Sequence, residues 1–181
     1  MSCYRRIRLP GASYFFTLAL AERGATILVD HVEELRRAFH ATIRTLPVHC
    51  DAIVILPDHL HAVWTLPPGD SDFPERWRKI KYRFSRAVRW TVGRTAHPTY
   101  RSISKRRKRE AGIWQRRYWE HCIRDAADYR AHVEYCWGNP VKHGYVARAV
   151  DWPYSSIHRD IRLGQVDPEW AGALVDGEFG E

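Results

Sequence analysis

Two β-prone runs on either side of a two-residue turn constrain the fold of this chain most. Ala52–Leu56 (AIVIL) is followed by Pro57–Asp58 and then by His59–Leu66 (HLHAVWTL). Short apolar runs that flank turn residues are typical of strands paired as an antiparallel hairpin. Tyr14–Leu20 (YFFTLAL) and Ile113–Ile123 (IWQRRYWEHCI) have the same aromatic and β-branched character. The sequence therefore predicts four strands, of which the middle two form a hairpin.

Three segments with helical periodicity separate or follow these strands. Asp30 with Glu33 has the spacing of a capping box, and Asp72 and Asp125 are further candidate N-caps. The helices are expected over residues 30–46, 74–92 and 125–138, and the last should end before Pro140 because the preceding residue resists the helical conformation. The order β-α-β-β-α-β-α predicts an α+β fold. It is expected to be a ferredoxin-like sandwich, one antiparallel sheet with helices on one face, followed by an irregular C-terminal tail.

The length of the chain, 181 residues, suits one domain with a core of its own. We expect residues 1–145 to form this domain and residues 146–181 to be a tail that packs on it. No apolar run is long enough for a membrane span, and no apolar signal core follows the N-terminal charges. These features predict a soluble, cytoplasmic protein without a membrane partner.

Lysine and arginine are concentrated in one segment. Residues 74–117 contain sixteen of them against Glu75 and Glu110, a net charge of +14, whereas the whole chain carries +8 and the remainder therefore −6. One strongly basic segment in an otherwise acidic chain indicates a polyanionic partner. A solvated helix followed by a basic loop would give the same composition.

The basic segment begins with an amphipathic helix. Trp77, Ile80, Phe84 and Val88 share one face. The opposite arc is expected to carry Arg76, Arg78, Lys79, Arg83, Arg86 and Arg89, with only Lys81 near the apolar side. The following stretch, Gly93–Gly112, has no apolar periodicity, contains Lys105–Arg109, and predicts a flexible basic loop.

His59 and His61 flank Leu60 in a predicted strand. Because side chains alternate along a strand, both imidazoles should point to one face of the sheet and Leu60 to the other. Two adjacent imidazoles can chelate a divalent metal ion. Two half-exposed strand histidines without a metal would show the same pattern.

The third predicted helix contains two tyrosines with different surroundings. Tyr129, Val133, Cys136 and Trp137 share the expected core face, whereas Asp128, His132, Tyr135 and Asn139 fall on the opposite side. Tyr135 and Asn139 are four residues apart and should lie one above the other. We therefore expect Tyr129 to pack and Tyr135 to be the chemically available tyrosine. An exposed tyrosine and an asparagine that merely ends the helix would also fit.

A histidine pair on a strand followed by a tyrosine on a later helix is the arrangement of the HUH endonucleases. Within that superfamily the chain resembles the REP-associated tyrosine transposases over roughly residues 4 to 160. The matching stretches are Tyr4–Arg6, Tyr14–Thr17, Leu56–His61, Trp64–Pro67, Phe73, Arg76–Lys81, Ile113–His121, Ile123–Asp125, Tyr135, Asn139–Gly144, Asp151–Ser156 and His158–Asp160.

The resemblance implies a metal-dependent endonuclease and strand transferase that attacks single-stranded DNA with Tyr135. It implies a metal site made by His59, His61 and Asn139, with Mg²⁺ or Mn²⁺ as the ion. Related mobile transposases often have a glutamine at the third position, so the shorter Asn139 departs from that pattern. The implied partner is single-stranded DNA with hairpins (REP- or BIME-like elements), bound by a monomer or homodimer associated with the nucleoid.

Basic side chains are expected to bind the DNA backbone. They are Arg5, Arg6 and Arg8 at the N-terminus, Arg78, Lys79, Arg83 and Arg86 on the amphipathic helix, and Arg116 and Arg117 near the last strand. Trp114, Tyr118 and Trp119 interleave with the last two arginines and are candidates to stack on unpaired bases.

Two other functions fit the same sequence. A catalytically inactive relative would bind hairpins without forming a covalent adduct. A metal-dependent RNA-binding nuclease would use a metal-bound water and leave Tyr135 as a bystander. Formation of a protein–DNA adduct distinguishes both from a transposase.

Overall fold

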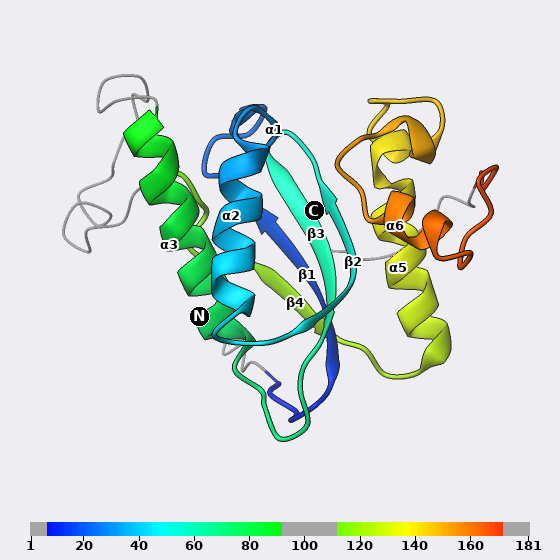
Figure 1. The fold of residues 1–181 in the computed structure, drawn as a ribbon, viewed down its shortest axis with the longest axis horizontal. Coiled ribbons are helices and arrows are strands. Elements are labelled where there is room, and N and C mark those ends of the chain that lie inside the picture. The colour runs from blue at the N-terminus through cyan, green and yellow to red at the C-terminus, as the bar shows by residue number, and fades with distance from the viewer. Residues whose placement is uncertain (1–6, 92–111, 172–181) are drawn as a thin grey trace, which may run out of the picture.

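The computed structural model describes residues 7–91 and 112–171. Its strands are β1 (Ser13–Ala19), β2 (His49–Ile55), β3 (His59–Thr65) and β4 (Trp119–Cys122). They form one sheet in the order β2-β3-β1-β4, and all neighbours are antiparallel (Figure 1). The predicted hairpin is β2–β3. The fourth strand is shorter than expected, because it begins at Trp119 and not at Ile113. Before it, an isolated bridge joins Trp114 to Leu20.

The helices are α1 (Ile27–Asp30), α2 (Val32–Ile43), α3 (Phe73–Thr91), α5 (Ala126–Lys142) and α6 (Ile157–Arg162), with a 3₁₀ turn, η1, at Ala149–Asp151. The main elements follow the predicted order, and the predicted α+β class with one antiparallel sheet is confirmed. None of the helices in the described ranges combines the length and the apolarity that a membrane span requires.

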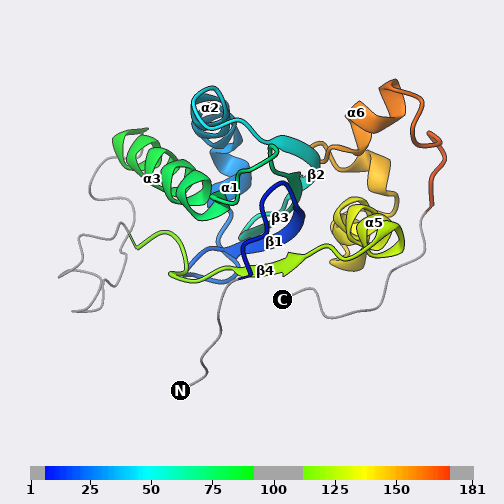
Figure 2. The same cartoon turned by 90° about the horizontal axis from the view of Figure 1, so that it is seen from below.

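The helices cover both faces of the sheet, whereas the sequence analysis expected one. On one face, Phe16, Leu60 and Trp64 form a core with residues of α2 and α3. On the other face, Phe15 and Val63 pack with residues of α5 (Figure 2). All of β3 from His59 to Trp64 is buried, so its two faces both need a cover. A short connection from β4 can reach either face, and the periodicity of α5 does not decide between them.

Two helix ends also differ from the predictions. Asp30 is the last residue of α1, and α2 begins after His31, so the expected capping box is absent. The helix α5 does begin at the predicted cap, where Asp125 Oδ1 accepts from the backbone N–H groups of Ala127 and Asp128 at 2.9 Å each. It then continues through Pro140 to Lys142, and the backbone N–H of His143 still donates to the Asn139 carbonyl.

The segment after α5 lies along the outer edge of β2. Ile55 N–H donates to the Tyr154 carbonyl, and Ser156 N–H donates to the Ile53 carbonyl, at 2.9 and 2.8 Å. These bonds cover an edge that would otherwise expose backbone groups. The segment contains η1 and α6 and is therefore more regular than the predicted tail. The division of the chain at residue 145 stays a prediction.

Arg76 is not on the cationic face of α3, where the helical wheel placed it. Its side chain is 1% exposed, and it donates to the Asp70 carboxylate and to the Pro47 carbonyl at 2.6 Å each. Further bonds reach the carbonyls of Leu46 and Asp72. The guanidinium therefore fastens the start of α3 to the loop before β2, and the planar fork of arginine suits this set of acceptors.

Replacement of Arg76 by methionine is expected to lower the free energy of unfolding by about 3 kcal/mol, because buried carbonyl groups lose their donor. Urea unfolding measures this change. Arg36→Met is the matched control, since Arg36 is exposed and its pair with Glu33 lies at the surface. Equal stabilities of the two variants would contradict the structural role of Arg76.

Candidate active site

The two histidines of β3 lie side by side on the face of the sheet that α5 covers. His59 is 2% and His61 0% exposed, and their ring centroids are 5.1 Å apart. Leu60 packs in the core on the opposite face, as the strand alternation predicts. The His61 ring also stacks on Phe15 at 5.4 Å, which fixes its orientation.

One nitrogen of each ring is held by a neighbouring side chain. His59 Nδ1 lies 2.6 Å from Asp58 Oδ1, and His61 Nδ1 lies 2.9 Å from Thr17 Oγ1. Burial alone would raise the pKa of Asp58, but hydrogen bonds from His59 and from the Gly24 backbone outweigh it and the pKa is lowered. The Asp58 carboxylate accepts a hydrogen bond from His59 Nδ1, and a neutral His59 ring then has its lone pair on Nε2. Carboxylate–histidine pairs of this kind typically orient metal ligands.

Tyr135 lies beside His61, with ring centroids 5.2 Å apart. It is 3% exposed and packs with Val133 and Cys136, so the prediction that it points away from the apolar stripe is wrong. Both stripes of α5 contact the sheet. Lys142 Nζ donates to Tyr135 Oη at 3.0 Å and lies 4.8 Å from the centre of its ring.

Two more polar side chains lie at the end of α5, and one of them is beside the histidine pair. Asn139, one turn beyond Tyr135, is 1% exposed. The His143 ring lies 5.0 Å from His59. Sequence reasoning missed Lys142 and His143 because it ended the helix before Pro140. The adjacent Asp58 and His59 are the feature of the sequence that indicates the carboxylate–histidine pair.

Tyr129 is a packing residue, as predicted. Its hydroxyl donates to Asp51 Oδ1 at 2.9 Å, away from the histidine pair. Burial and the Asp51 carboxylate both raise its pKa well above the ordinary tyrosine value. This hydroxyl is therefore hard to deprotonate and poorly suited to act as a nucleophile.

A second histidine group lies on the same face of the sheet. Among the described residues, His121, Asp128 and His132 have ligand atoms within 4.8 Å of one another and could hold a metal ion. The ring of Phe15, 4.8 Å from His132 and 5.4 Å from His61, lies between the two groups. In the structure, the Asp128 carboxylate accepts from His121 Nε2 at 2.8 Å and lies 3.1 Å from His132 Nδ1, so this group also ties β4 to α5.

Asp128 is expected to stabilise the fold in a pH-dependent way. Burial alone would raise its pKa, but hydrogen bonds from His121 and Arg124 outweigh it and hold the pKa far below the ordinary value. A carboxylate with a depressed pKa contributes stability above pH 4 or so, and this contribution is lost as the pH falls towards the folded-state pKa. Asp128→Asn should therefore cost about 2 kcal/mol at pH 7, and the difference should shrink in acid.

Urea unfolding at pH 7 and pH 3 measures this effect. Asp125→Asn is a matched control on the same helix, because asparagine caps a helix as well as aspartate does. A difference between wild type and Asp128→Asn that is the same at both pH values would contradict the prediction.

The predicted DNA-binding side chains are distributed over several surfaces. Arg8, Arg78, Arg86, Arg116 and Arg117 are exposed. Arg5, Arg6 and Lys105–Arg109 lie outside the described residues. Of the three aromatic residues expected to stack on bases, Trp114 is buried against Phe84 and is wrongly predicted, while Tyr118 and Trp119 are half-buried.

Comparisons with known proteins identify relatives of the chain. No family model matches the chain. It is 41% identical over 181 residues to the REP-associated tyrosine transposase of Escherichia coli (strain K12), an alignment that covers 100% of this chain and 98% of the relative. A Haemophilus influenzae protein assigned to the same family is 42% identical over 174 residues, 95% of this chain and 94% of the relative.

A solved structure supports the same relationship. The structure of a REP-associated tyrosine transposase bound to a REP hairpin matches this fold with a TM-score of 0.86 and 41% sequence identity, covering 100% of this chain and 98% of the other. Both similarities extend over the whole chain and therefore include the strand with the histidine pair and the helix with Tyr135. The chain belongs to the family of REP-associated tyrosine transposases.

Proposed function

We propose that the protein is a metal-dependent endonuclease and strand transferase that acts on single-stranded DNA next to REP-type hairpins. The observation that carries the proposal is the position of Tyr135. Its ring lies 5.2 Å from His61, and its hydroxyl accepts a hydrogen bond from Lys142. A tyrosine, a cation and a histidine pair are thus together in a chain that belongs to a transposase family.

Tyr135 is the nucleophile in this proposal. Its Oη attacks a phosphorus atom of the DNA, the bond from phosphorus to the 3′ oxygen breaks, and the proton lost by the tyrosine ends on that oxygen. The products are a 5′-phosphotyrosine and a free 3′-hydroxyl. The new ester conserves the bond energy, so a second 3′-hydroxyl can reseal the strand. Because Tyr135 is only 3% exposed, its ring or its neighbours must move to admit the phosphate.

Lys142 assists the attack electrostatically. A tyrosine hydroxyl normally loses its proton near pH 10 and is a weak nucleophile at neutral pH. The Lys142 ammonium donates to Oη at 3.0 Å and stabilises the negative charge that develops there.

The residues around Tyr135 fit a divalent metal ion. Nε2 of His59, Nε2 of His61 and Oδ1 of Asn139 are all buried on this side of the sheet, and Asp58 orients one of the rings. Imidazole and amide groups suit Mg²⁺ or Mn²⁺ when phosphate and water oxygens complete the shell. When bound, such an ion neutralises and polarises the phosphate that Tyr135 attacks.

We assign the ion to this pair rather than to His121, Asp128 and His132. The Asp128 carboxylate already accepts from the Arg124 backbone and side chain at 2.9 and 3.1 Å. His132 Nδ1 lies 2.8 Å from the Asp128 carbonyl of its own helix. His61 of the β3 pair lies beside Tyr135, with ring centroids 5.2 Å apart.

A denaturing gel tests the proposal. The protein is mixed with Mn²⁺ and a single-stranded DNA that carries a hairpin, labelled at either the 5′ or the 3′ end. A 5′-phosphotyrosine retains the 3′-labelled fragment on the protein and releases the 5′-labelled one with a free hydroxyl. Binding without an adduct would identify a catalytically inactive relative, and cleavage of RNA without an adduct would identify a water-using nuclease.

Binding to the DNA backbone should depend steeply on salt. Several phosphate contacts predict a loss of affinity of roughly 10³-fold or more between 50 and 200 mM salt, somewhat less if only a single strand is bound. Charge reversal at Arg78, Arg83 and Arg86 should weaken binding to all sequences about equally, because phosphate contacts carry no sequence information. Fluorescence anisotropy with matched and scrambled hairpins measures both effects. A flat salt dependence would show that these side chains do not bind the backbone.

A further inference from the structure

One row of side chains along α3 alternates arginine with an aromatic residue. Arg78, Tyr82, Arg86 and Trp90 are four residues apart and therefore form one ridge on the helix surface. At 1.5 Å per residue, neighbours in this α3 ridge are spaced by about 6 Å along the helix. The alternation places a cation next to each ring.

The aromatic members of the α3 ridge are unusually exposed. Tyr82 is 61% and Trp90 90% exposed, whereas large aromatic side chains are mostly buried in folded proteins. The packing face of α3 is already complete without them, because Trp77, Phe84 and Val88 occupy the core. The two exposed rings therefore contribute little to the fold.

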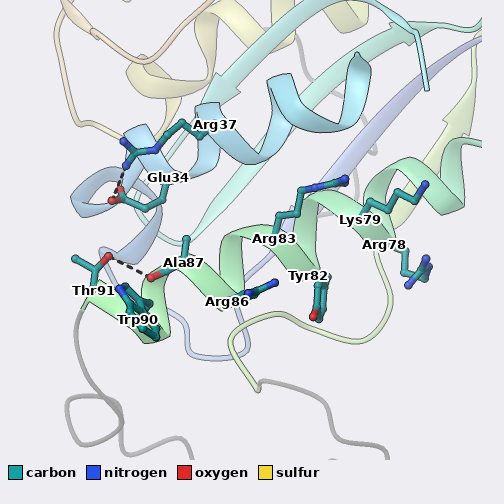
Figure 3. Close-up of a pocket in the computed structure, with 10 residues that line it drawn as sticks. All are labelled: Glu34, Arg37, Arg78, Lys79, Tyr82, Arg83, Arg86, Ala87, Trp90 and Thr91. Carbon is teal, nitrogen blue, oxygen red and sulfur yellow. Dashed lines mark hydrogen bonds and ion pairs between the residues drawn. The ribbon is translucent and has the colours of Figure 1, made fainter. Parts of the chain in front are cut away.

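The surroundings of the α3 ridge are strongly basic. A groove of about 810 Å³ between α2 and α3 is lined by the ridge and by Arg37, Lys79 and Arg83, against a single carboxylate, Glu34 (Figure 3). Arg78 forms an ion pair with Glu75 next to the groove. The excess of positive charge favours a polyanionic ligand.

Other basic side chains of α3 serve the fold instead. Arg76 fastens the start of the helix, and Lys81 donates to the Gln115 carbonyl at 2.7 Å and lies over the Trp114 ring. The α3 ridge thus differs from them both in its exposure and in its alternation with aromatic rings.

We propose that the α3 ridge is a second DNA-binding site, which holds an unpaired segment of the strand by stacking bases on Tyr82 and Trp90. Arg78 and Arg86 would contact the phosphates between them. An exposed ring can stack only on a base whose face is available, and a duplex hides these faces. Stacking on aromatic side chains together with cationic contacts is the general means of binding single strands, and it tolerates any base. This inference rests on the proposed function, because that function supplies DNA as the ligand.

The α3 ridge is remote from Tyr135. α3 packs on one face of the sheet and α5 on the other, so the sheet lies between the two helices. When Tyr135 attacks a DNA strand, the segment of that strand that can reach the α3 ridge therefore lies beyond the cleaved phosphate. The ridge should act on the affinity for DNA that carries such a segment.

The test compares two DNA probes by fluorescence anisotropy with the full chain. One is a hairpin with a single-stranded flank that contains 2-aminopurine, and the other is the same hairpin without a flank. Trp90→Leu should weaken binding of the flanked hairpin by about tenfold and reduce the quenching of 2-aminopurine, and it should change binding of the blunt hairpin by less than about twofold. Trp90→Phe, which keeps a ring, should restore most of the affinity.

Charge controls separate stacking from electrostatics. Arg86→Gln should weaken binding of the flanked hairpin and lower the slope of log affinity against log salt concentration by about one unit. Arg36→Gln, an equal change of charge on the exposed side of α2, should do neither. If wild type forms the Tyr135 adduct but Trp90→Leu binds the flanked hairpin as tightly as wild type, only the α3 ridge proposal is overturned. If wild type binds neither probe, the proposed function fails, and the ridge proposal with it.

Discussion

Tyr135→Phe is expected to abolish strand cleavage and the covalent adduct while leaving hairpin binding nearly intact. The substitution removes only Oη, so the ring keeps its contacts with Phe15 and His61 at 5.8 and 5.2 Å. Loss of the nucleophile leaves no route to a phosphotyrosine, and we expect a decrease in cleavage rate of at least about 10³-fold. A denaturing gel measures the adduct, and anisotropy measures binding.

Tyr129→Phe is the control for this experiment. It removes a hydroxyl from the same helix, but that hydroxyl donates to Asp51 and not towards the histidine pair. The variant should lose about 1 kcal/mol of stability and keep its cleavage activity. If Tyr129→Phe removed cleavage while Tyr135→Phe did not, the choice of nucleophile would be wrong.

Replacement of His59 or His61 by alanine is expected to remove metal-dependent cleavage, and Asn139→Ala to weaken it less. Each histidine is held by a fixed neighbour, Asp58 or Thr17, so the loss of one imidazole removes an oriented ligand. The loss of a ligand or of its orienting partner typically lowers the metal affinity by 10-fold or more. Calorimetric titration with Mn²⁺ measures this affinity without DNA, and the cleavage assay measures the consequence.

His49→Ala is the matched control, because His49 lies on β2 with a side chain that is 75% exposed. Imidazole binds metal only when neutral, so the Mn²⁺ affinity of the wild type should fall as the pH is lowered. Full activity of both single histidine variants in the presence of EDTA would end the metal hypothesis. A Mn²⁺ affinity that depends on His121 or His132 instead would move the site to the second histidine group.

Much of the candidate site follows from local sequence rules. The alternation of a strand places His59 and His61 on one face, whatever covers that face. The cap at Asp125 fixes the register of the helix that contains Tyr135 and Asn139. The periodicity of α5 predicts different surroundings for Tyr129 and Tyr135, which the structure confirms, but Tyr135 does not point away from the apolar residues. Local rules therefore predicted the relative positions of these residues better than their surroundings.

The sequence by itself determined the four strands, the hairpin, the amphipathic α3 and the orientation of the histidine pair, because these depend on periods of two or 3.6 residues and on turn chemistry. The tertiary structure decided which face α5 covers, that it continues past Pro140, and that Arg76 is buried. These outcomes depend on contacts between residues far apart in the chain, which no local pattern contains. The continuation of α5 past Pro140 brings Lys142 to Tyr135 on the same helix, and the packing of α5 on the sheet brings His143 to His59.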